Sequence, residues 1–352
     1  MRRSLLDILL DPVSRTPLDL EVDAYGDGDT VLEGRLVGAG GRSYPVARGV
    51  PRFSLSEDAG QQQTGKSFGF KWEQRHTYDT AGMRSTVLPW LLERYGFDSV
   101  EALRAFFAHR RRILDVGCGS GFTSSLWLNP DWRGGGVADW VGAELSSAID
   151  VARERLRDIP GTEFVQADIM LLPFRDNSFD TIYAEGVLHH TPSTEKAFRS
   201  LVPLLMPGGE MLFYVYRRKG PLREFADDYI RSVVSKLEPA KAWELLRPLT
   251  RLGQALASLH AEIEVPEDVP YLGIKAGRYD VQRLVYWHFA KMYWNDRLSD
   301  EENVHVNFDW YHPAYAHRHT EEEIRGWCAD NGLAITHLDV QESGYTVRAV
   351  KE

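Results

Sequence analysis

The sequence has only two cysteines and no long apolar run. Cys118 and Cys328 can build neither a disulfide framework nor a four-ligand zinc site, which favours a reducing compartment, and we expect the cytoplasm. The opening stretch MRRSLLDILLDP is apolar only briefly, because Asp7 interrupts it and Pro12 ends it. Such a run is too short for export or for spanning a bilayer, so we expect no membrane partner.

The chain also lacks an excess of positive charge. Its formal net charge is −10, which opposes the electrostatic attraction that most nucleic-acid binders use. A nucleic-acid partner is therefore disfavoured. A local exception is the basic run at residues 217–219 with Arg223 close behind, which fits either a solvated turn or a contact to a substrate carboxylate or phosphate.

The composition is that of a folded protein with more than one domain. Of 352 residues, 43% are hydrophobic and 26% are charged. We expect a β-rich module at 1–55, a linker and N-terminal flap at 56–85, a main domain at 86–216 and 318–352, and a helical, aromatic-rich lid at 217–317.

Within the expected linker and flap, the sequence pattern of two segments fits more than one structure. Residues 56–66 are polar and Gln-rich, which favours a linker or a loop. Residues 67–82 are dense in aromatics and fit either a loop packed on the main domain or a flap that closes on a ligand.

The N-terminal stretch LLDPVSRTPLDL resembles a small zinc-ribbon-like module that is known as an activator of tRNA methyltransferases and is also found fused to bacterial methyltransferases. That module usually begins Cys-Pro-x-Cys, whereas Asp11 and Ser14 hold the cysteine positions here. Without the thiolates no metal site can form from this motif, so we expect a metal-free module that folds on its apolar core. It would serve packing or dimerisation, and a homodimer is accordingly a candidate assembly.

The rest of the chain alternates strand and helix patterns. Helices are predicted within 86–108 and at 121–129, and a capping box at Thr320 and Glu323 begins another helix. Strands are predicted at 111–116, up to Glu144, up to Asp168, and at 180–186, 210–216, 333–340 and 344–351. This order implies an α/β fold: a doubly wound, Rossmann-like sheet of seven strands with helices on both faces.

The first predicted strand runs into a glycine-rich turn. ILDVGCGSGFT places Gly117, Gly119 and Gly121 at alternate positions directly after Asp115, and only glycine lets a ligand approach such a backbone closely. A pyrophosphate there would meet the Asp115 carboxylate, and the repulsion is about 4 kcal/mol per charge pair at about 4 Å and an effective dielectric of about 20. The turn therefore favours a cationic ligand over a dinucleotide.

These residues, with Glu144, Gln166-Ala167-Asp168 and the turn Pro207-Gly208-Gly209, resemble the motifs of class I S-adenosylmethionine-dependent methyltransferases, closest to the ubiquinone/menaquinone-biosynthesis type. The resemblance implies S-adenosylmethionine as cofactor and S-adenosylhomocysteine as product. It places Asp115 near the ammonium, Glu144 on the ribose hydroxyls, and Asp168 and Ile169 at the adenine. The expected cofactor-binding set is Asp115, Gly117, Cys118, Gly119, Gly121, Glu144, Leu145, Asp168, Ile169 and Glu185.

The acceptor should lie beyond the carboxyl end of the fourth predicted strand, where the sequence reads YAEGVLHHTP. His189 or His190 could take a proton or could brace the loop, and Glu185 could steer a cationic amine. The motif Asn/Asp-Pro-Pro-aromatic of many base N-methyltransferases is absent, which argues against base methylation.

Further residues are expected at the substrate. Aromatic side chains of the lid could exclude water or could be ordinary core. His312, His317 and His319 could suggest a metal, but their irregular spacing favours contacts of His317 or Arg318 with a substrate anion, and we expect no metal. The expected substrate-binding set is Tyr216, Tyr286, Tyr311, His317 and Arg318.

The leading hypothesis is a cytoplasmic enzyme that methylates a small-molecule metabolite, with specialised (natural product) biosynthesis as one setting. One alternative keeps the chemistry with tRNA or a protein as acceptor, prompted by the N-terminal module. Another is a regulatory protein that binds S-adenosylmethionine without turnover.

Overall fold

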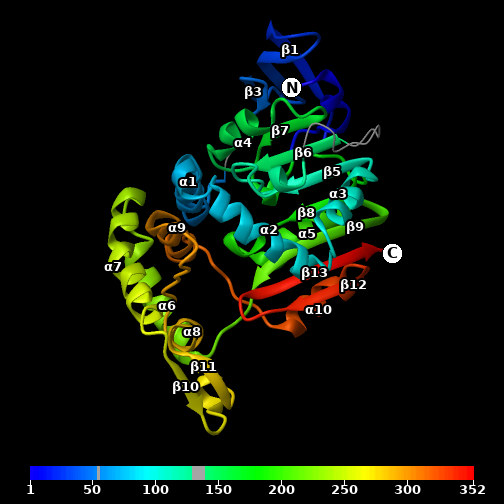
Figure 1. Cartoon of the computed structure of the whole chain (residues 1–352). Helices are drawn as coiled ribbons and strands as arrows, with labels where there is room; N and C mark the ends of the chain where they lie inside the picture. The colour runs from blue at the N-terminus through cyan, green and yellow to red at the C-terminus, as the bar shows by residue number, and fades with distance from the viewer. Residues whose placement is uncertain (54–55, 129–138) are drawn as a thin grey trace.

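The computed structural model describes residues 1–53, 56–128 and 139–352. The N-terminal part forms a small antiparallel sheet with the order β1-β2-β3-β4. Its strands are β1 (Leu18–Tyr25), β2 (Val31–Gly38), β3 (Ser43–Ala47) and β4 (Val50–Pro51). Figure 1 shows this sheet at one end of the molecule, beyond β7 of the main domain.

Within the described ranges the central sheet has seven strands, in the order β12-β13-β9-β8-β5-β6-β7. Its strands are β5 (Arg112–Val116), β6 (Asp139–Glu144), β7 (Thr162–Gln166), β8 (Phe179–Ala184), β9 (Leu205–Tyr216), β12 (Leu333–Val340) and β13 (Gly344–Lys351). The five from β9 to β7 run parallel, whereas β13 pairs antiparallel with β9 and with β12. The predicted doubly wound fold is confirmed, and its direction of winding reverses between β5 and β8, where α/β sheets bind ligands.

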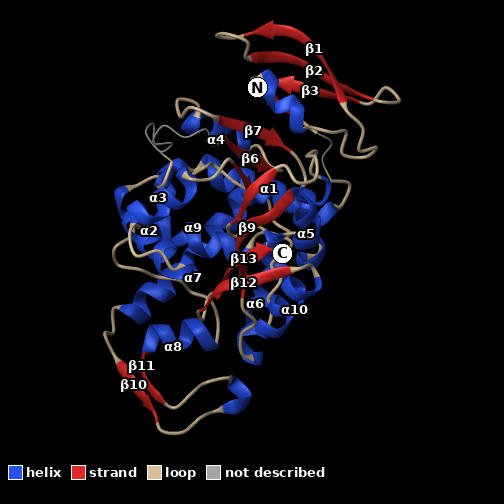
Figure 2. Ribbon diagram, turned by 90° about the vertical axis from the view of Figure 1, so that its right-hand side faces the viewer, coloured by secondary structure: helices blue, strands red, loops and turns tan. Residues whose placement is uncertain are grey.

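Helices cover both faces of this sheet. Alternation along β5 turns Ile113 toward a core shared with α2, α3 and α4, and Leu114 toward a core shared with α5 and α10 (Figure 2). The bounds are α2 (Ala81–Tyr95), α3 (Val100–Ala108), α4 (Ala148–Leu156), α5 (Thr194–Leu201) and α10 (Glu321–Asp330). The capping box predicted at Thr320 and Glu323 is present at the start of α10.

The N-terminal module adds to the edge of the central sheet. The backbone N–H of Phe53 donates to the carbonyl of Gln166 in β7 at 2.9 Å, and Arg52 pairs in parallel with the same residue. The Arg52 guanidinium also donates to Gln166 Oε1 at 2.8 Å and to Asp150 at 2.7 Å. These bonds fix the module beside β7, at the end of the sheet opposite β12.

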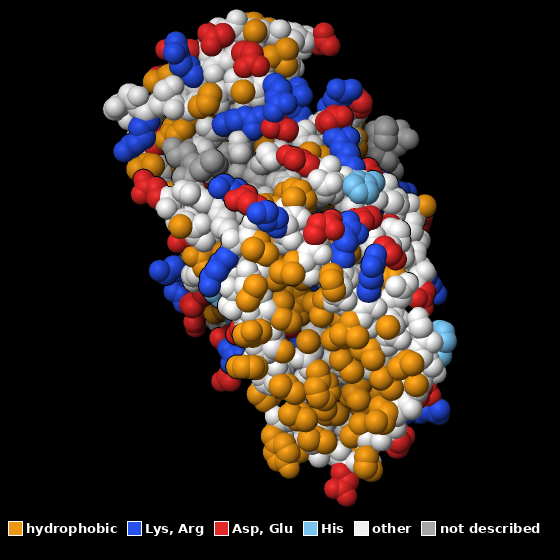
Figure 3. Space-filling model, turned by 90° about the vertical axis from the view of Figure 1, so that its left-hand side faces the viewer, with side chains coloured by type: hydrophobic (Ala, Val, Ile, Leu, Met, Phe, Trp, Pro, Cys, Tyr) orange, Lys and Arg blue, Asp and Glu red, His pale blue; other side chains and the backbone are white. Residues whose placement is uncertain are grey.

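Residues between β9 and α10 form a helical insertion beside the carboxyl ends of the parallel strands. It contains α6 (Pro221–Val234), α7 (Pro239–Ala257), β10 (Glu262–Val265), β11 (Gly277–Asp280), α8 (Val281–His288) and α9 (Asp300–Tyr311). Its inner side packs with Tyr214 and Tyr216 of β9 in a core of its own. Figure 3 shows a broad apolar surface on the side of the molecule where the insertion lies. Exposed apolar side chains of the insertion include Phe225, Tyr229, Leu252 and Leu259.

The prediction for residues 56–66 as a linker or loop is wrong. The structure has a helix there, α1 (Ala59–Glu73), whose N-cap Asp58 accepts from the Gln61 N–H at 2.7 Å. The glutamines that suggested a linker are good helix formers, and the glycines of the helix permit close packing. A Cβ on Gly69 would lie 2.8 Å from Ser147 Oγ, and one on Gly60 would lie 2.6 Å from the Tyr315 ring.

The helix predicted at 121–129 is also wrong in length. The structure has a short 3-10 turn at Ser124–Leu126, and residue 129 lies outside the described ranges. Serine and threonine prefer caps and turns to helix interiors, and Ser124 uses its hydroxyl to bond Asp115. Among the described residues no helix is both long and apolar enough to cross a membrane.

Candidate functional site

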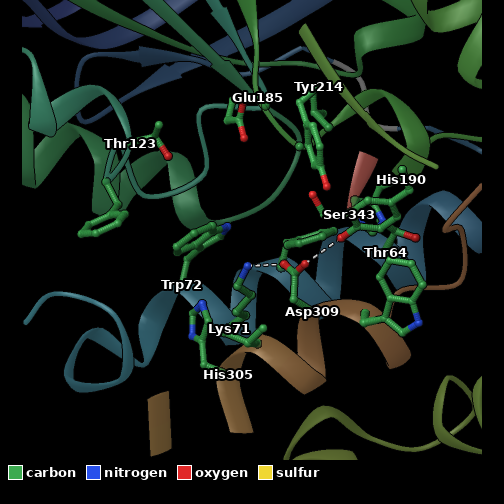
Figure 4. A pocket seen from close by; sticks show the side chains of 18 of the residues that line it. Thr64, Lys71, Trp72, Thr123, Glu185, His190, Tyr214, His305, Asp309 and Ser343 are labelled. Atoms are coloured by element: carbon green, nitrogen blue, oxygen red, sulfur yellow. Dashed lines mark hydrogen bonds and ion pairs between the residues drawn. The ribbon is translucent and has the colours of Figure 1, made fainter. Parts of the chain in front are cut away.

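A cavity of about 550 Å³ lies where the winding of the sheet reverses. At one end it is lined by residues that follow β5, β6 and β8, such as Gly117, Leu145 and Gly186. The opposite end is lined by the insertion, including Tyr286 and Trp310. Helix α1 forms a wall between the two ends, and Figure 4 shows its side chains Thr64, Lys71 and Trp72 at the cavity.

The glycine turn faces the cavity at one of its glycines and packs against protein side chains at the other two. Gly117 lines the cavity with φ at +66°, and its N–H donates to the Ala143 carbonyl at 2.7 Å. Gly119, with φ at +54°, lies under Trp72, since a Cβ there would be 2.7 Å from the indole Nε1. Gly121 packs on Leu156 of α4, so of the three glycines it is Gly117 that lines the cavity.

Asp115 does not lie where the sequence argument placed it. Alternation along β5 turns its side chain into the core, where it is 3% exposed and accepts from Ser124 Oγ at 2.5 Å. Burial, with Glu144 and Glu185 nearby, raises the pKa of Asp115 to about 7 despite that hydrogen bond. The Asp115 carboxylate does not line the cavity and holds the segment after the turn through Ser124, and its contact with a ligand ammonium stays a prediction.

Cys118, another predicted cofactor contact, also lies outside the cavity lining. Its side chain is buried and faces Gly142 of β6, because a Cβ on that glycine would be 2.9 Å from the sulfur. Burial raises the pKa of the thiol well above its usual range. Cys118 is a core residue and lies away from the cavity wall.

The residues after β6 do face the cavity. Glu144 accepts from the Gly119 N–H at 3.0 Å and from the Ser146 N–H at 2.8 Å, and its carboxylate keeps lone pairs for a further donor. Leu145 lines the wall beside it. Glu144 is thus a fixed, buried acceptor at the cavity surface.

The residues after β7 divide between the cavity and the core. Ile169 lines the cavity with Ala167 and Leu172, and these apolar side chains suit a planar ring. Asp168 is 3% exposed, accepts from the Met170 N–H at 2.9 Å and caps a short turn, and burial raises its pKa. Asp168 does not line the cavity, so its predicted contact with adenine is not supported by its position.

Glu185, which directly follows β8, lines the cavity (Figure 4). Two residues of α2 bond its carboxylate. The fully buried Arg94 donates to one oxygen at 2.5 Å, and Tyr95 donates to the other at 2.6 Å. The Arg94 guanidinium stacks 3.5 Å from the Trp90 ring centre, which locks its orientation. A carboxylate paired in this way is a fixed negative charge and a poor general base.

The two histidines differ in position. His190 lines the cavity, and its Nδ1 lies 2.6 Å from the Tyr315 carbonyl, which can only accept. Its Nε2 therefore carries the lone pair, and this atom has no partner among the described residues. Burial lowers the pKa of His190 to about 4, so the ring is neutral at pH 7.

His189 does not line the cavity, and its predicted role as a base is not supported. Its ring is fully buried and lies 3.7 Å from the Tyr216 ring centre. Burial holds its pKa well below the usual range. His189 supports the wall behind its neighbour.

A charged pair inside the cavity has no counterpart in the sequence predictions. Lys71 of α1 pairs with Asp309 of α9, and Tyr216 donates to the other Asp309 oxygen at 3.0 Å (Figure 4). The Lys71 ammonium lies 4.0 Å from the Trp72 ring centre. Although burial opposes it, the nearby Lys71 cation lowers the pKa of Asp309 below its usual range.

His305 of α9 is another cavity residue that the sequence did not single out. Its Nδ1 lies 2.8 Å from Thr77 Oγ1, and burial lowers its pKa well below the usual range. The dense aromatics around Lys71 were the available signal for α1. Nothing in the sequence marks Asp309 or His305, because their partners lie more than two hundred residues away.

The predicted substrate contacts are only in part at the cavity. Tyr216 and Tyr286 line it. Tyr311 is fully buried and donates to Asp227 at 2.8 Å, which makes it part of the core of the insertion.

The other two predicted contacts, His317 and Arg318, are bonded within the protein, and their contact with a substrate stays a prediction. His317 Nε2 lies 3.0 Å from the Thr191 carbonyl, and Arg318 donates to Glu224 at 2.8 Å and Asp228 at 2.6 Å. Neither lines the cavity, and the Arg318 charge is neutralised within the protein.

Comparison with known proteins places the glycine turn within a recognised family. A family model described as a methyltransferase domain matches residues 114–213. A ubiquinone/menaquinone biosynthesis C-methyltransferase of Photorhabdus laumondii is 30% identical over 191 residues, covering 48% of this chain and 73% of that protein.

Two further relatives are similar over shorter spans. A protein of Idiomarina loihiensis with the same description is 30% identical over 153 residues, 42% of this chain and 58% of its own length. A human protein described as probable tRNA methyltransferase 9B is 33% identical over 116 residues, 32% of this chain and 23% of that protein. The chain thus spans less than two thirds of the length of these two relatives.

Proposed function

The chain belongs to the class I S-adenosylmethionine-dependent methyltransferases, and from this we propose that it methylates a small-molecule acceptor held in the inner part of its cavity. The observation that carries the proposal is the continuity of the cavity. One continuous cavity joins Gly117 and Glu144, at the carboxyl ends of the strands, to Tyr286 and Trp310 in the insertion. A space of about 550 Å³ is of the size that holds small ligands.

The residues at the strand ends fit S-adenosylmethionine. Glu144 offers acceptor oxygens for hydroxyl groups, and the apolar strip of Leu145 and Ile169 suits a heterocycle. Gly186, with φ at +72°, leaves open space where a Cβ would stand. The bound cofactor would supply an electrophilic methyl group on a sulfonium.

Glu185 takes the role that the sequence assigned to Asp115. It follows β8 two residues before Val187, whose side chain packs on Gly117, and all three line the cavity. Since Arg94 and Tyr95 hold its carboxylate in place, Glu185 presents a fixed negative charge at the turn and would attract the ammonium of the methionine part.

His190 would accept the proton from the acceptor group. Its neutral ring has the Nε2 lone pair free, and the Tyr315 carbonyl keeps the proton on Nδ1. The negative charge of Asp309 lies close enough to favour the imidazolium that forms. The aromatic walls exclude water while the acceptor is held in line, and such positioning can supply about 7 to 11 kcal/mol of the barrier.

The test is turnover by the purified chain. S-adenosylmethionine is incubated with a pool of small metabolites, and formation of S-adenosylhomocysteine is followed with and without ribonuclease. We expect turnover that survives ribonuclease, with kcat reduced about a hundredfold in His190→Gln and cofactor affinity unchanged. Turnover that requires RNA or protein would refute the small-molecule proposal, and cofactor binding without turnover on any pool would favour a binding role.

A further inference from the structure

The inner end of the cavity carries more positive charge than its surroundings neutralise. Lys219, Arg223, Arg283 and Lys291 line it together with Tyr286, Trp287 and Trp310. Other charges at the cavity have partners: Glu185 has Arg94, and Asp309 has Lys71. Arg223 is paired with the buried Asp227 at 2.7 Å. Arg283 donates to the neutral Trp294 carbonyl at 3.5 Å, and neither it nor the two lysines has an ion pair among the described residues.

Lys291 has no partner for its ammonium among the described residues. The residue is 6% exposed and lines the cavity, yet the hydrogen bond that it donates is made by its backbone N–H, to Asp227 Oδ1. The ammonium lies 4.7 Å from the Trp310 ring centre. A buried, unpaired ammonium is costly to the fold, which points to a ligand that completes it.

Lys219 is half-buried and has hydrogen-bond partners, but it has no ion pair among the described residues. Its ammonium donates to the carbonyls of Glu342 and Ser343, which are neutral, and lies 5.2 Å from the Trp287 ring centre. The Glu342 carboxylate is paired at 3.7 Å with Arg217 instead. Backbone carbonyls thus fix the position of the Lys219 ammonium, but they do not balance its positive charge.

The titration of the two lysines agrees with this geometry. Burial lowers the pKa of Lys291 to about 7, with Arg223 adding repulsion and Asp309 opposing it. Burial likewise lowers the pKa of Lys219 to about 7, with repulsion from Arg223 and with the Glu342 carboxylate opposing it. An anion bound beside them would restore both charges.

We propose that the acceptor is an aryl carboxylate whose carboxylate group binds at Lys219 and Lys291, with its ring against Tyr286, Trp287 and Trp310. The assignment rests on the proposed function, because it describes the acceptor end of the same cavity. A flat ring suits walls made of aromatic faces, and a carboxylate supplies two acceptor oxygens for two ammonium donors. Asp309 does not repel the anion strongly, since Lys71 and Tyr216 already bond its two oxygens.

The test uses matched pairs of probes and calorimetry on the full chain loaded with S-adenosylhomocysteine. The probes are 4-hydroxybenzoate, 4-hydroxyphenylacetate and 4-hydroxycinnamate, each beside its neutral methyl ester. At least one acid should bind about tenfold or more tightly than its ester. Lys291→Met should remove that preference, and the control Lys241→Met, at an exposed position on α7, should keep it.

The melting temperature of Lys291→Met without ligand separates a ligand-binding role of Lys291 from a structural role. If Lys291 serves a ligand, Lys291→Met without any ligand should melt at a higher temperature than the wild type, because an unpaired buried charge is removed. If Lys291 is structural, the variant melts lower, and the proposal is overturned.

Lys219→Met provides a second variant and should also lose the preference for the acid. Esters that bind as well as acids, or acids that do not bind the loaded protein, would overturn the inference while leaving methyl transfer intact. Failure to bind S-adenosylhomocysteine at all would instead refute the proposed function.

Discussion

The ion pair between Lys71 and Asp309 connects helix α1 to the insertion, and its removal should be costly. The Lys71 side chain is 6% exposed and that of Asp309 is 25% exposed, where it faces the cavity. Lys71→Met keeps most of the side-chain volume but leaves the Asp309 carboxylate without its counter-charge. The hydrogen bond from Tyr216, at 3.0 Å, remains.

The magnitude follows from this burial. Removing one partner of a fully buried pair costs about 3 to 5 kcal/mol, and the exposed part of Asp309 with its remaining hydrogen bond reduces this to about 2 kcal/mol. Asp309→Asn should cost a similar amount, because Lys71 then loses its counter-charge. The double variant removes both charges, and its cost should fall to about 1 kcal/mol, since replacing a whole buried pair is often nearly neutral.

The assay is urea denaturation followed by tryptophan fluorescence, with the wild type, both single variants and the double variant in one cycle. Lys66→Met, at an exposed position on the same helix, is the matched control and should unfold like the wild type. Single variants that cost less than about 0.5 kcal/mol, or a double variant whose cost equals their sum, would show that the pair does not hold α1 to the insertion.

Three further outcomes are expected. Burial lowers the pKa of His190 to about 4, so its contribution to stability is full above about pH 6.5 and is lost as the pH falls toward 4. Between about pH 7.5 and 5.5 the unfolding free energy of the wild type should therefore fall by about 1 kcal/mol relative to that of His190→Gln. Parallel curves of unfolding free energy against pH would contradict this. Glu144→Gln should weaken S-adenosylhomocysteine binding about tenfold in calorimetry, whereas equal affinity would remove Glu144 from the cofactor site. Gly119→Ala, which forces a Cβ against Trp72 at positive φ, should lower the unfolding free energy by about 1 to 3 kcal/mol, and unchanged stability would argue against the packed turn.

The sheet was predictable because its evidence is local. Strand runs that are buried on both faces, such as the one through Ile113 and Leu114, and the capping box at Thr320 leave marks within a few residues. The predicted domain boundaries and the role of the insertion as a lid stay predictions. The order of the strands was not predictable, since pairing depends on contacts between distant segments.

The candidate site was predictable only where backbone geometry decides the position. Gly117 and Glu144 end strands and so reach the cavity. Asp115 was misplaced because the two-residue period of β5 turns it inward, where Ser124 satisfies it. Arg318 was misplaced because acidic residues of α6 neutralise it.

Helix α1 illustrates how tertiary contacts override composition. Its sequence is rich in glutamine and glycine, which is typical of linkers, and its buried face became apparent only with Tyr315 and Ser147 packed on its glycines. Lys71 and Asp309 are 238 positions apart, and spacing cannot relate residues at that separation.

Helix α1 also has a kinetic consequence. The same helix places Trp72 over Gly119 at the end of the cavity that suits the methyl donor, and joins α9 through Lys71 at the other end. Gln63, on the first turns of that helix, donates to the His312 carbonyl at 2.8 Å and extends the connection. A displacement of α1 that releases the methyl donor would therefore also disturb the binding site at the other end of the cavity. The methyl donor and the acceptor should accordingly bind and leave in a fixed order.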